Sequence, residues 1–178
     1  MKTMSIVLPA YNEEQMIEKT ARTIARLMDN EDISYELVFV NDGSKDQTWE
    51  RIKEASTNNS NVKGICFSRN FGKEGAVFAG LANASGDCVA VMDCDLQHPP
   101  ETLLTMYRLW EQGYQVIEGV KASRGREGFL HKFFAKTFYK IISNATGVDM
   151  SRASDFKLLD RAAVDEFLKP VSYTHLRA

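Results

Sequence analysis

Two aspartates one residue apart, directly after an apolar run, are the residues of this sequence best suited to chemistry. Asp93 and Asp95 follow the run Cys88–Met92, which has the length and composition of a buried strand. Such a strand delivers both carboxylates to one edge of a sheet, where Mg²⁺ or Mn²⁺ can link them to a diphosphate. Hard cations take oxygen ligands and complete their shell with substrate phosphates and water, and Gln97 offers a further oxygen. The motif therefore predicts an enzyme that handles a nucleotide diphosphate.

A structural interpretation of the same motif is open as well. Acidic residues often end strands to solvate a turn, and His98, Pro99, Pro100 and Glu101 resemble the start of a helix. His98 fits a turn or cap better than a metal ligand, since imidazole is a poorer match for Mg²⁺ than oxygen. The choice between the two interpretations depends on the rest of the chain.

Apolar runs of strand length alternate along the chain with periodic segments of helix length. We expect strands at 4–9, 36–40, 62–67, 87–92 and 115–119, and helices at 13–28, 46–55, 73–84 and 100–110. This alternation predicts an α/β fold of Rossmann-like type, with a mostly parallel sheet and helices on both faces. Ligands of such sheets bind beyond the carboxyl ends of the strands, at a switch point in strand order.

The predicted strand exits are therefore the place to look for a site. They comprise residues 9–14, 41–46, 68–74 and 93–99, and all four are polar. One acidic exit is ordinary, whereas several that converge on one edge indicate a binding cleft.

Composition narrows the class of protein further. The chain has 178 residues, 44% of them hydrophobic and 26% charged, and its net charge of −2 argues against nonspecific nucleic-acid binding. Its three cysteines, Cys66, Cys88 and Cys94, lack metal-binding spacing, so we expect reduced thiols in a cytosolic setting. No apolar run approaches the roughly 18 residues of a membrane helix. Residues 171–178 show no hydrophobic periodicity, and we assign them no function. This end can be a non-native sequence.

A basic, aromatic segment follows the last predicted strand. Residues 121–140 hold six lysines or arginines against one acid, with phenylalanines interleaved. The segment fits an amphipathic helix on a membrane surface or against an anionic partner. It fits equally well a helix that buries its aromatic side chains in the core and leaves its lysines in water.

Five blocks of this chain, taken in order, resemble the family 2 glycosyltransferases. Among them the chain is similar to the polyprenyl-phosphate glycosyltransferases, such as dolichol-phosphate mannose synthase and the undecaprenyl-phosphate glucosyltransferases. The blocks are residues 7–13, 41–44, 68–74, 93–99 and 154–161. The resemblance implies a GT-A fold and transfer of a sugar from a nucleotide-sugar to a lipid phosphate.

The resemblance also implies roles for the residues that bind the donor. Asp93 and Asp95 match the metal motif, and Asp42 matches the residue that holds the base. Pro9, Tyr11 and Glu13 match positions that line the nucleoside pocket, and Lys73 stands where it can contact the nucleotide. Alternatives remain: Asp42 can cap the helix that begins near Asp46, Glu13 can complement a helix dipole, and Lys73 can be solvated.

On the acceptor side, Asp155 matches the residue usually assigned as the base, or else it is a structural acid. Arg124 and Arg126 lie in the loop where the family places contacts to the acceptor phosphate, and arginine suits bidentate phosphate binding. Lys157 departs from the family, which usually has arginine there. Lysine keeps the positive charge but lacks the planar guanidinium group, so bidentate recognition is lost.

We therefore expect one GT-A catalytic domain, residues 1–170, that is an inverting, metal-dependent hexosyltransferase. Its donor is a UDP- or GDP-hexose, its acceptor is polyprenyl phosphate at the cytoplasmic face of the membrane, and homo-oligomers are possible. The inverting mechanism is implied by the family alone. The alternatives are a family member with a saccharide or protein acceptor, or a noncatalytic nucleotide-binding module. Bacterial relatives carry membrane-spanning helices after this domain, so we also expect the chain to be truncated at its C-terminus.

Overall fold

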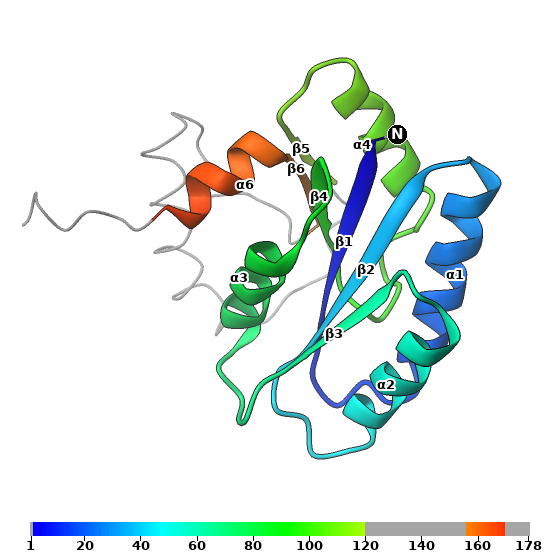
Figure 1. Ribbon diagram of the computed structural model, residues 1–178, viewed down its shortest axis with the longest axis vertical. Helices are drawn as coiled ribbons and strands as arrows, with labels where there is room; N and C mark the ends of the chain where they lie inside the picture. Colours follow the sequence, from blue (N-terminus) through cyan, green and yellow to red (C-terminus); the bar gives the residue numbers. More distant parts are fainter. Residues whose placement is uncertain (1, 120–155, 170–178) are drawn as a thin grey trace, which may run out of the picture.

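The computed structural model describes residues 2–119 and 156–169, which form a six-stranded sheet with helices on both faces (Figure 1). This architecture confirms the predicted α/β fold. In chain order the elements are β1 (Thr3–Ala10), α1 (Ile17–Asn30), β2 (Ser34–Asn41), α2 (Thr48–Asn58), β3 (Val62–Cys66), α3 (Lys73–Asn83), β4 (Cys88–Val91), α4 (Thr102–Glu111), β5 (Val116–Glu118), β6 (Lys157–Asp160) and α6 (Arg161–Leu168).

The order of the strands places a switch point at the middle of the sheet. The strands run β3-β2-β1-β4-β6-β5, and β1 pairs in parallel with β2 on one side and with β4 on the other. The chain therefore moves outward from β1 to β3 and then returns to the opposite side of β1. The two directions diverge between β1 and β4, where open α/β sheets bind their ligands.

Two apolar layers hold the helices on the sheet. Residues of β1 alternate between them: Ile6 and Leu8 face α1, α2 and α4, whereas Val7 faces α3 and α6. Figure 1 shows α1 and α2 to the right of the sheet, α4 at the top of the view, and α3 and α6 to the left. Because β1 is covered on both faces, it reads as a continuous apolar run. On the second face α3 comes so near that a Cβ on Gly80 would lie 2.2 Å from Cγ1 of Val7.

Two features of the fold differ from the sequence-based prediction. The first helix begins at Ile17, not at residue 13, because the amides of Glu13 and Glu14 donate to the side chains of Thr48, at the start of α2, and Asp46, just before it. In addition, β6 and α6 were not predicted. β6 has four residues and runs antiparallel between β4 and β5, and its position depends on pairing across distant parts of the chain.

Several predicted features lie outside the described residues: the basic segment 121–140 with Arg124 and Arg126, the residue Asp155, and the end 171–178. In the part of the chain that is described, no helix is both long enough and apolar enough to cross a membrane.

A buried carboxylate joins the strands at the end of the sheet opposite the predicted site. Glu36 of β2 is 6% exposed and forms an ion pair with Lys63 of β3. It also accepts hydrogen bonds from the Ser5 hydroxyl at 2.6 Å and from the Ser85 hydroxyl at 3.0 Å. Burial alone would raise the pKa of this carboxyl, but the hydrogen bonds outweigh burial and lower the pKa to about 2.

We predict that Glu36→Gln lowers the free energy of unfolding by about 1–3 kcal/mol at neutral pH, because hydrogen bonds to a charged group are lost. The folded pKa of about 2 lies below the ordinary value of 4.5, so this stabilisation is complete above pH 4.5 and disappears as the pH falls towards 2. Urea unfolding at several pH values should therefore show the wild type and the variant converging in acid.

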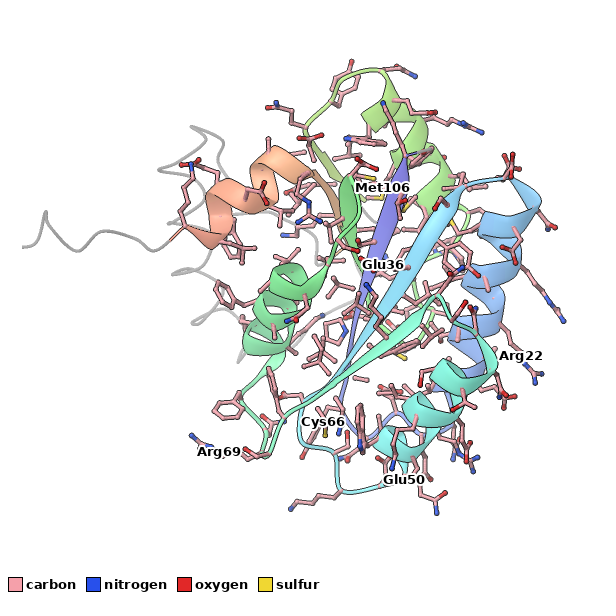
Figure 2. The ribbon with its side chains drawn as sticks, viewed as in Figure 1. Arg22, Glu36, Glu50, Cys66, Arg69 and Met106 are labelled. Carbon is pink, nitrogen blue, oxygen red and sulfur yellow. The ribbon has the colours of Figure 1, made fainter. Side chains whose placement is uncertain are left out.

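Glu50→Gln is the matched control, because Glu50 is an exposed residue of α2 that pairs with Lys53 at 3.4 Å. Figure 2 shows Glu36 among the strands and Glu50 on the outer helix. The linkage would be contradicted if Glu36→Gln and the wild type differed in free energy of unfolding by the same amount from pH 7 to about pH 2.

Candidate functional site

A pocket lies where the strands β1, β2 and β4 end, at the switch point of the sheet. Its volume is about 220 Å³, and its lining comes from four segments: Pro9, Ala10, Tyr11, Asp42, Asn70, Gly72, Lys73, Ala76 and Asp93. Pockets that enclose a whole ligand usually measure roughly 300–1,000 Å³. This pocket therefore has room for one part of a nucleotide-sized ligand.

The loops after β1 and β2 are tied to each other by reciprocal hydrogen bonds. The amide of Asn12 donates to the Ser44 hydroxyl at 2.9 Å, and the amide of Lys45 donates to the Asn12 side chain at 2.9 Å. Farther along, the amide of Gln47 donates to the Glu14 carboxylate at 2.8 Å. Because each loop satisfies backbone groups of the other, Tyr11 and Asp42 are held on the same rim.

Asp42 in turn fixes the loop after β3. Its side chain accepts hydrogen bonds from the backbone amides of Phe71 at 2.7 Å and Gly72 at 3.0 Å, and the residue is 3% exposed. The sequence offered two roles for Asp42, a base contact and a cap of the helix that begins near Asp46. The structure adds a third, in which the carboxylate anchors a loop 29 residues away. A carboxylate has about four acceptor positions, so two remain for a ligand.

The contact between these two loops requires a glycine after Asp42. Gly43 has a φ of +65°, and a Cβ there would lie 2.3 Å from the backbone carbon of Arg69. Any larger residue would push the loops apart. Figure 2 shows Arg69 at the turn between β3 and α3, at the edge of the molecule.

The paired aspartates after β4 are positioned by the residue between them. Cys94 is 2% exposed, and its carbonyl accepts a hydrogen bond of 2.6 Å from the Thr20 hydroxyl of α1. Burial raises the pKa of its thiol to about 12, so it is an inert anchor. With Cys94 turned to the core, the flanking Asp93 and Asp95 are partly exposed.

Lys73 and Asp93 form an ion pair across the pocket. The Lys73 ammonium, on the first residue of α3, lies 2.6 Å from Oδ1 of Asp93, and both side chains are about one-third exposed. Two residues that the sequence assigned separately to the nucleotide and the metal are therefore direct partners.

Glu13 lies beside the paired aspartates, although it does not line the pocket. Burial raises the pKa of its carboxyl first, and the negative charges of Asp95, Asp46 and Asp93 raise it further. Four carboxylates thus share one edge of the sheet. Their mutual repulsion is what a bound cation would relieve.

The end of the aspartate motif is a turn. Oδ1 of Asp95 accepts a hydrogen bond from the Gln97 amide at 3.0 Å, around Leu96 with a φ of 58°. The Gln97 side chain is exposed and does not line the pocket. His98 is buried, with its ring 4.9 Å from that of Phe156, so the motif is joined to the beginning of β6.

The site fits a divalent cation of a particular kind. Among residues 2–119 and 156–169, no group of three or more histidines, cysteines or acids is arranged as a metal-ligand set. Mg²⁺ is commonly held by one or two carboxylates together with substrate phosphates, and Asp93 and Asp95 offer that number. These residues therefore suit a cation that binds together with a diphosphate.

The structure brings most of the predicted donor-site residues together. Pro9, Tyr11, Asp42, Lys73 and Asp93 line one pocket, whereas Glu13, Asp95 and Gln97 lie outside its lining. Their functional roles remain predictions.

Sequence reasoning missed four further lining residues and the contacts that organise the loop after β3. Ala10 stands between Pro9 and Tyr11. Asn70 and Gly72 stand within the block 68–74, in which only Lys73 was assigned a role, and Ala76 follows this block on α3. The glycine was the available signal, because Gly72 has a φ of +94°. No pattern in the sequence indicated the bonds to Asp42.

Comparison with known proteins identifies the family. Residues 5–168 match the family described as Glycosyl transferase family 2. The uncharacterized glycosyltransferase YkcC of Bacillus subtilis (strain 168) is 44% identical over 163 residues, covering 91% of this chain and 50% of that protein. The bactoprenol glucosyl transferase of Shigella phage SfV is 36% identical over 163 residues, covering 91% of this chain and 53% of that protein. The chain spans about half the length of these relatives.

Solved structures of similar fold cover most of this chain. Glucosyl-3-phosphoglycerate synthase from Mycobacterium tuberculosis, in complex with Mn²⁺, UDP and phosphoglyceric acid, is 26% identical with a TM-score of 0.61, covering 90% of this chain and 56% of that one. The mannosyltransferase PcManGT from Pyrobaculum calidifontis, in complex with GDP-Man and Mn²⁺, is 20% identical with a TM-score of 0.60, covering 90% and 45%. The fold is of the GT-A type, as expected. With a family match over residues 5–168, the chain belongs to glycosyl transferase family 2.

Proposed function

We propose that this chain is the catalytic domain, residues 1–170, of an inverting, metal-dependent hexosyltransferase. It moves a hexose from a UDP- or GDP-sugar to polyprenyl phosphate at the cytoplasmic face of the membrane. The observation that carries the proposal is the pocket at the switch point, which combines Tyr11, Asp42, Lys73 and Asp93. These residues supply an exposed aromatic ring, a buried hydrogen-bond acceptor, an ammonium group and a carboxylate. A nucleotide diphosphate requires groups of these kinds.

The relatives support the two substrates separately. The name bactoprenol glucosyl transferase, carried by relatives at 36% identity, supports a polyprenyl phosphate acceptor. The synthase solved with UDP and Mn²⁺, at 26% identity, supports a nucleotide donor and a divalent cation.

In the donor complex, Pro9 and Tyr11 pack against the nucleoside, and Tyr11 has the open surface for this, since it is 44% exposed. Asp42 accepts from the base edge with the lone pairs left by its two backbone bonds. Glu13 accepts from the ribose hydroxyls. Because Asp42 also anchors the loop after β3, nucleotide binding and the position of Lys73 are linked.

Asp93 and Asp95 would hold Mg²⁺ or Mn²⁺, and Gln97 would offer a further oxygen ligand. When bound, the cation neutralises charge on the leaving diphosphate. Lys73 adds a second positive charge on the nucleotide side. Transfer needs little more than positioning and charge compensation, because the acceptor is a phosphate monoester whose oxygen is ionised near neutral pH.

The acceptor side of the proposal rests on the resemblance. Asp155 orients or deprotonates the acceptor, and Arg124 and Arg126 hold its phosphate. Phe156 follows Asp155 directly and packs on His98 of the aspartate motif. Lys157 is 6% exposed and pairs with Val91 at the end of β4, which is consistent with a role close to the metal motif.

The first prediction of this proposal concerns the cation. Asp93→Asn and Asp95→Asn should each abolish transfer while the melting temperature stays near that of the wild type, and EDTA should abolish wild-type transfer. Asp29→Asn, at an exposed acid in the last turn of α1, is the control and should keep full activity. Full activity in EDTA, or in both variants, would exclude the metal role.

A second prediction separates binding from turnover. Asp42→Ala should weaken UDP or GDP binding by about 1–3 kcal/mol in titration calorimetry, since buried donors lose their acceptor. Asp155→Asn should instead lower kcat and leave donor affinity nearly unchanged. If Asp155→Asn only lowers the melting temperature, Asp155 is a structural acid.

The third prediction concerns the acceptor and the membrane. With labelled UDP- and GDP-hexoses, label should pass to polyprenyl phosphate and become lipid-extractable. Arg124→Ala and Arg126→Ala should raise the KM for the acceptor more than the KM for the donor.

Replacement of Lys132, Lys136 and Lys140 by glutamine should weaken binding to anionic vesicles by about 1 kcal/mol per lysine at low salt.

Salt should weaken the vesicle binding of the wild type as well. 3-Phosphoglycerate and a soluble saccharide serve as competing acceptors in the same assay. If vesicle binding is absent at low salt and a soluble acceptor is used well, the lipid acceptor is wrong.

A further inference from the structure

The Lys73–Asp93 ion pair uses the carboxylate that the proposed function gives to the divalent cation. The ammonium lies 2.6 Å from Oδ1 of Asp93 at an edge where Glu13, Asp93 and Asp95 gather. Of the described residues that line the pocket, Lys73 is the only lysine or arginine. Without a nucleotide, the positive charge at this carboxylate is therefore supplied by the protein itself.

We infer that Lys73 is an internal counter-cation, which holds Asp93 until a divalent cation arrives with the nucleotide diphosphate and then moves to the diphosphate. The inference rests on the proposed function and adds an order of binding to it: the cation alone binds weakly, and the cation with nucleotide binds well.

Electrostatics favour movement of the ammonium. An ammonium and a dication on the same carboxylate would repel each other in a partly buried site. A diphosphate reverses the balance, because it supplies oxygen ligands for the cation and a new anionic partner for the ammonium.

The backbone next to Lys73 is anchored, whereas the side chain of Lys73 is partly exposed. The preceding residue, Gly72, donates its amide to Asp42 at 3.0 Å and to the Asn70 side chain at 3.1 Å. The side chain of Lys73 is 36% exposed, and a flexible four-carbon stem separates its ammonium from the backbone. The ammonium can therefore exchange partners without unfolding the first turn of α3.

The test is the affinity of the full chain for Mn²⁺, measured by electron paramagnetic resonance of free Mn²⁺, first alone and then with UDP or GDP. Lys73→Met should bind Mn²⁺ alone about tenfold more tightly than the wild type, because the competing charge is gone. The same variant should bind UDP or GDP in the presence of Mn²⁺ more weakly, because the diphosphate loses the ammonium.

Two further variants are the controls. Lys73→Arg keeps the charge and should hold Mn²⁺ affinity near that of the wild type. Lys45→Met removes an exposed lysine outside the pocket lining and should change neither affinity. A merely structural role for Lys73 would lower both affinities of Lys73→Met together, whereas the counter-cation role moves them in opposite directions.

The outcomes separate this inference from the proposed function. If the wild type binds Mn²⁺ with nucleotide but Lys73→Met does not gain affinity for Mn²⁺ alone, the counter-cation role is wrong and the metal-dependent function stands. If the wild type binds no Mn²⁺ even with UDP and GDP, the metal dependence is wrong and this inference falls with it.

Discussion

The hydrogen bonds from the Phe71 and Gly72 amides to Asp42 are the interaction on which the site depends. They join the ends of β2 and β3 with a nearly buried carboxylate, and the close approach of the backbone at Gly43 leaves the loops little freedom. A buried carboxylate is costly unless its oxygens are satisfied, so the loop cannot move away without depriving Asp42 of two hydrogen bonds. The first residue of α3, Lys73, is placed as a consequence.

The same edge of the sheet concentrates negative charge. Parallel strands end together, and three of their exits bring Glu13, Asp46, Asp93 and Asp95 near one another. Such crowding destabilises a folded protein unless positive charge compensates it. In the structure Lys73 supplies part of that charge, and the arrangement is suited to a ligand that brings a cation of its own. Stability without ligand and affinity for ligand therefore involve the same carboxylates.

The antiparallel strand β6 connects the donor side to the later part of the chain. It inserts between β4 and β5 and pairs Lys157 with Val91, close to the aspartate motif. Phe156 packs on His98 and fills the space beside Gly119, where a Cβ would lie 2.7 Å from the Phe156 ring. Packing from both sides thus holds the turn after Asp95, since His98 and Cys94 are both buried.

The sequence by itself determined the parallel sheet, the helices on both faces and the strand exits that form the site. These features follow from local periodicity and from strands that end at one edge, and the five blocks indicated the family. Only the tertiary structure decided where α1 starts, where β6 pairs and how Asp42 anchors the loop after β3. Each depends on hydrogen bonds or packing between residues far apart in the chain, as with Glu13 on Thr48 and Asp42 on Phe71. The Lys73–Asp93 pair belongs to the same class, because a sequence shows charges but not the distance between them.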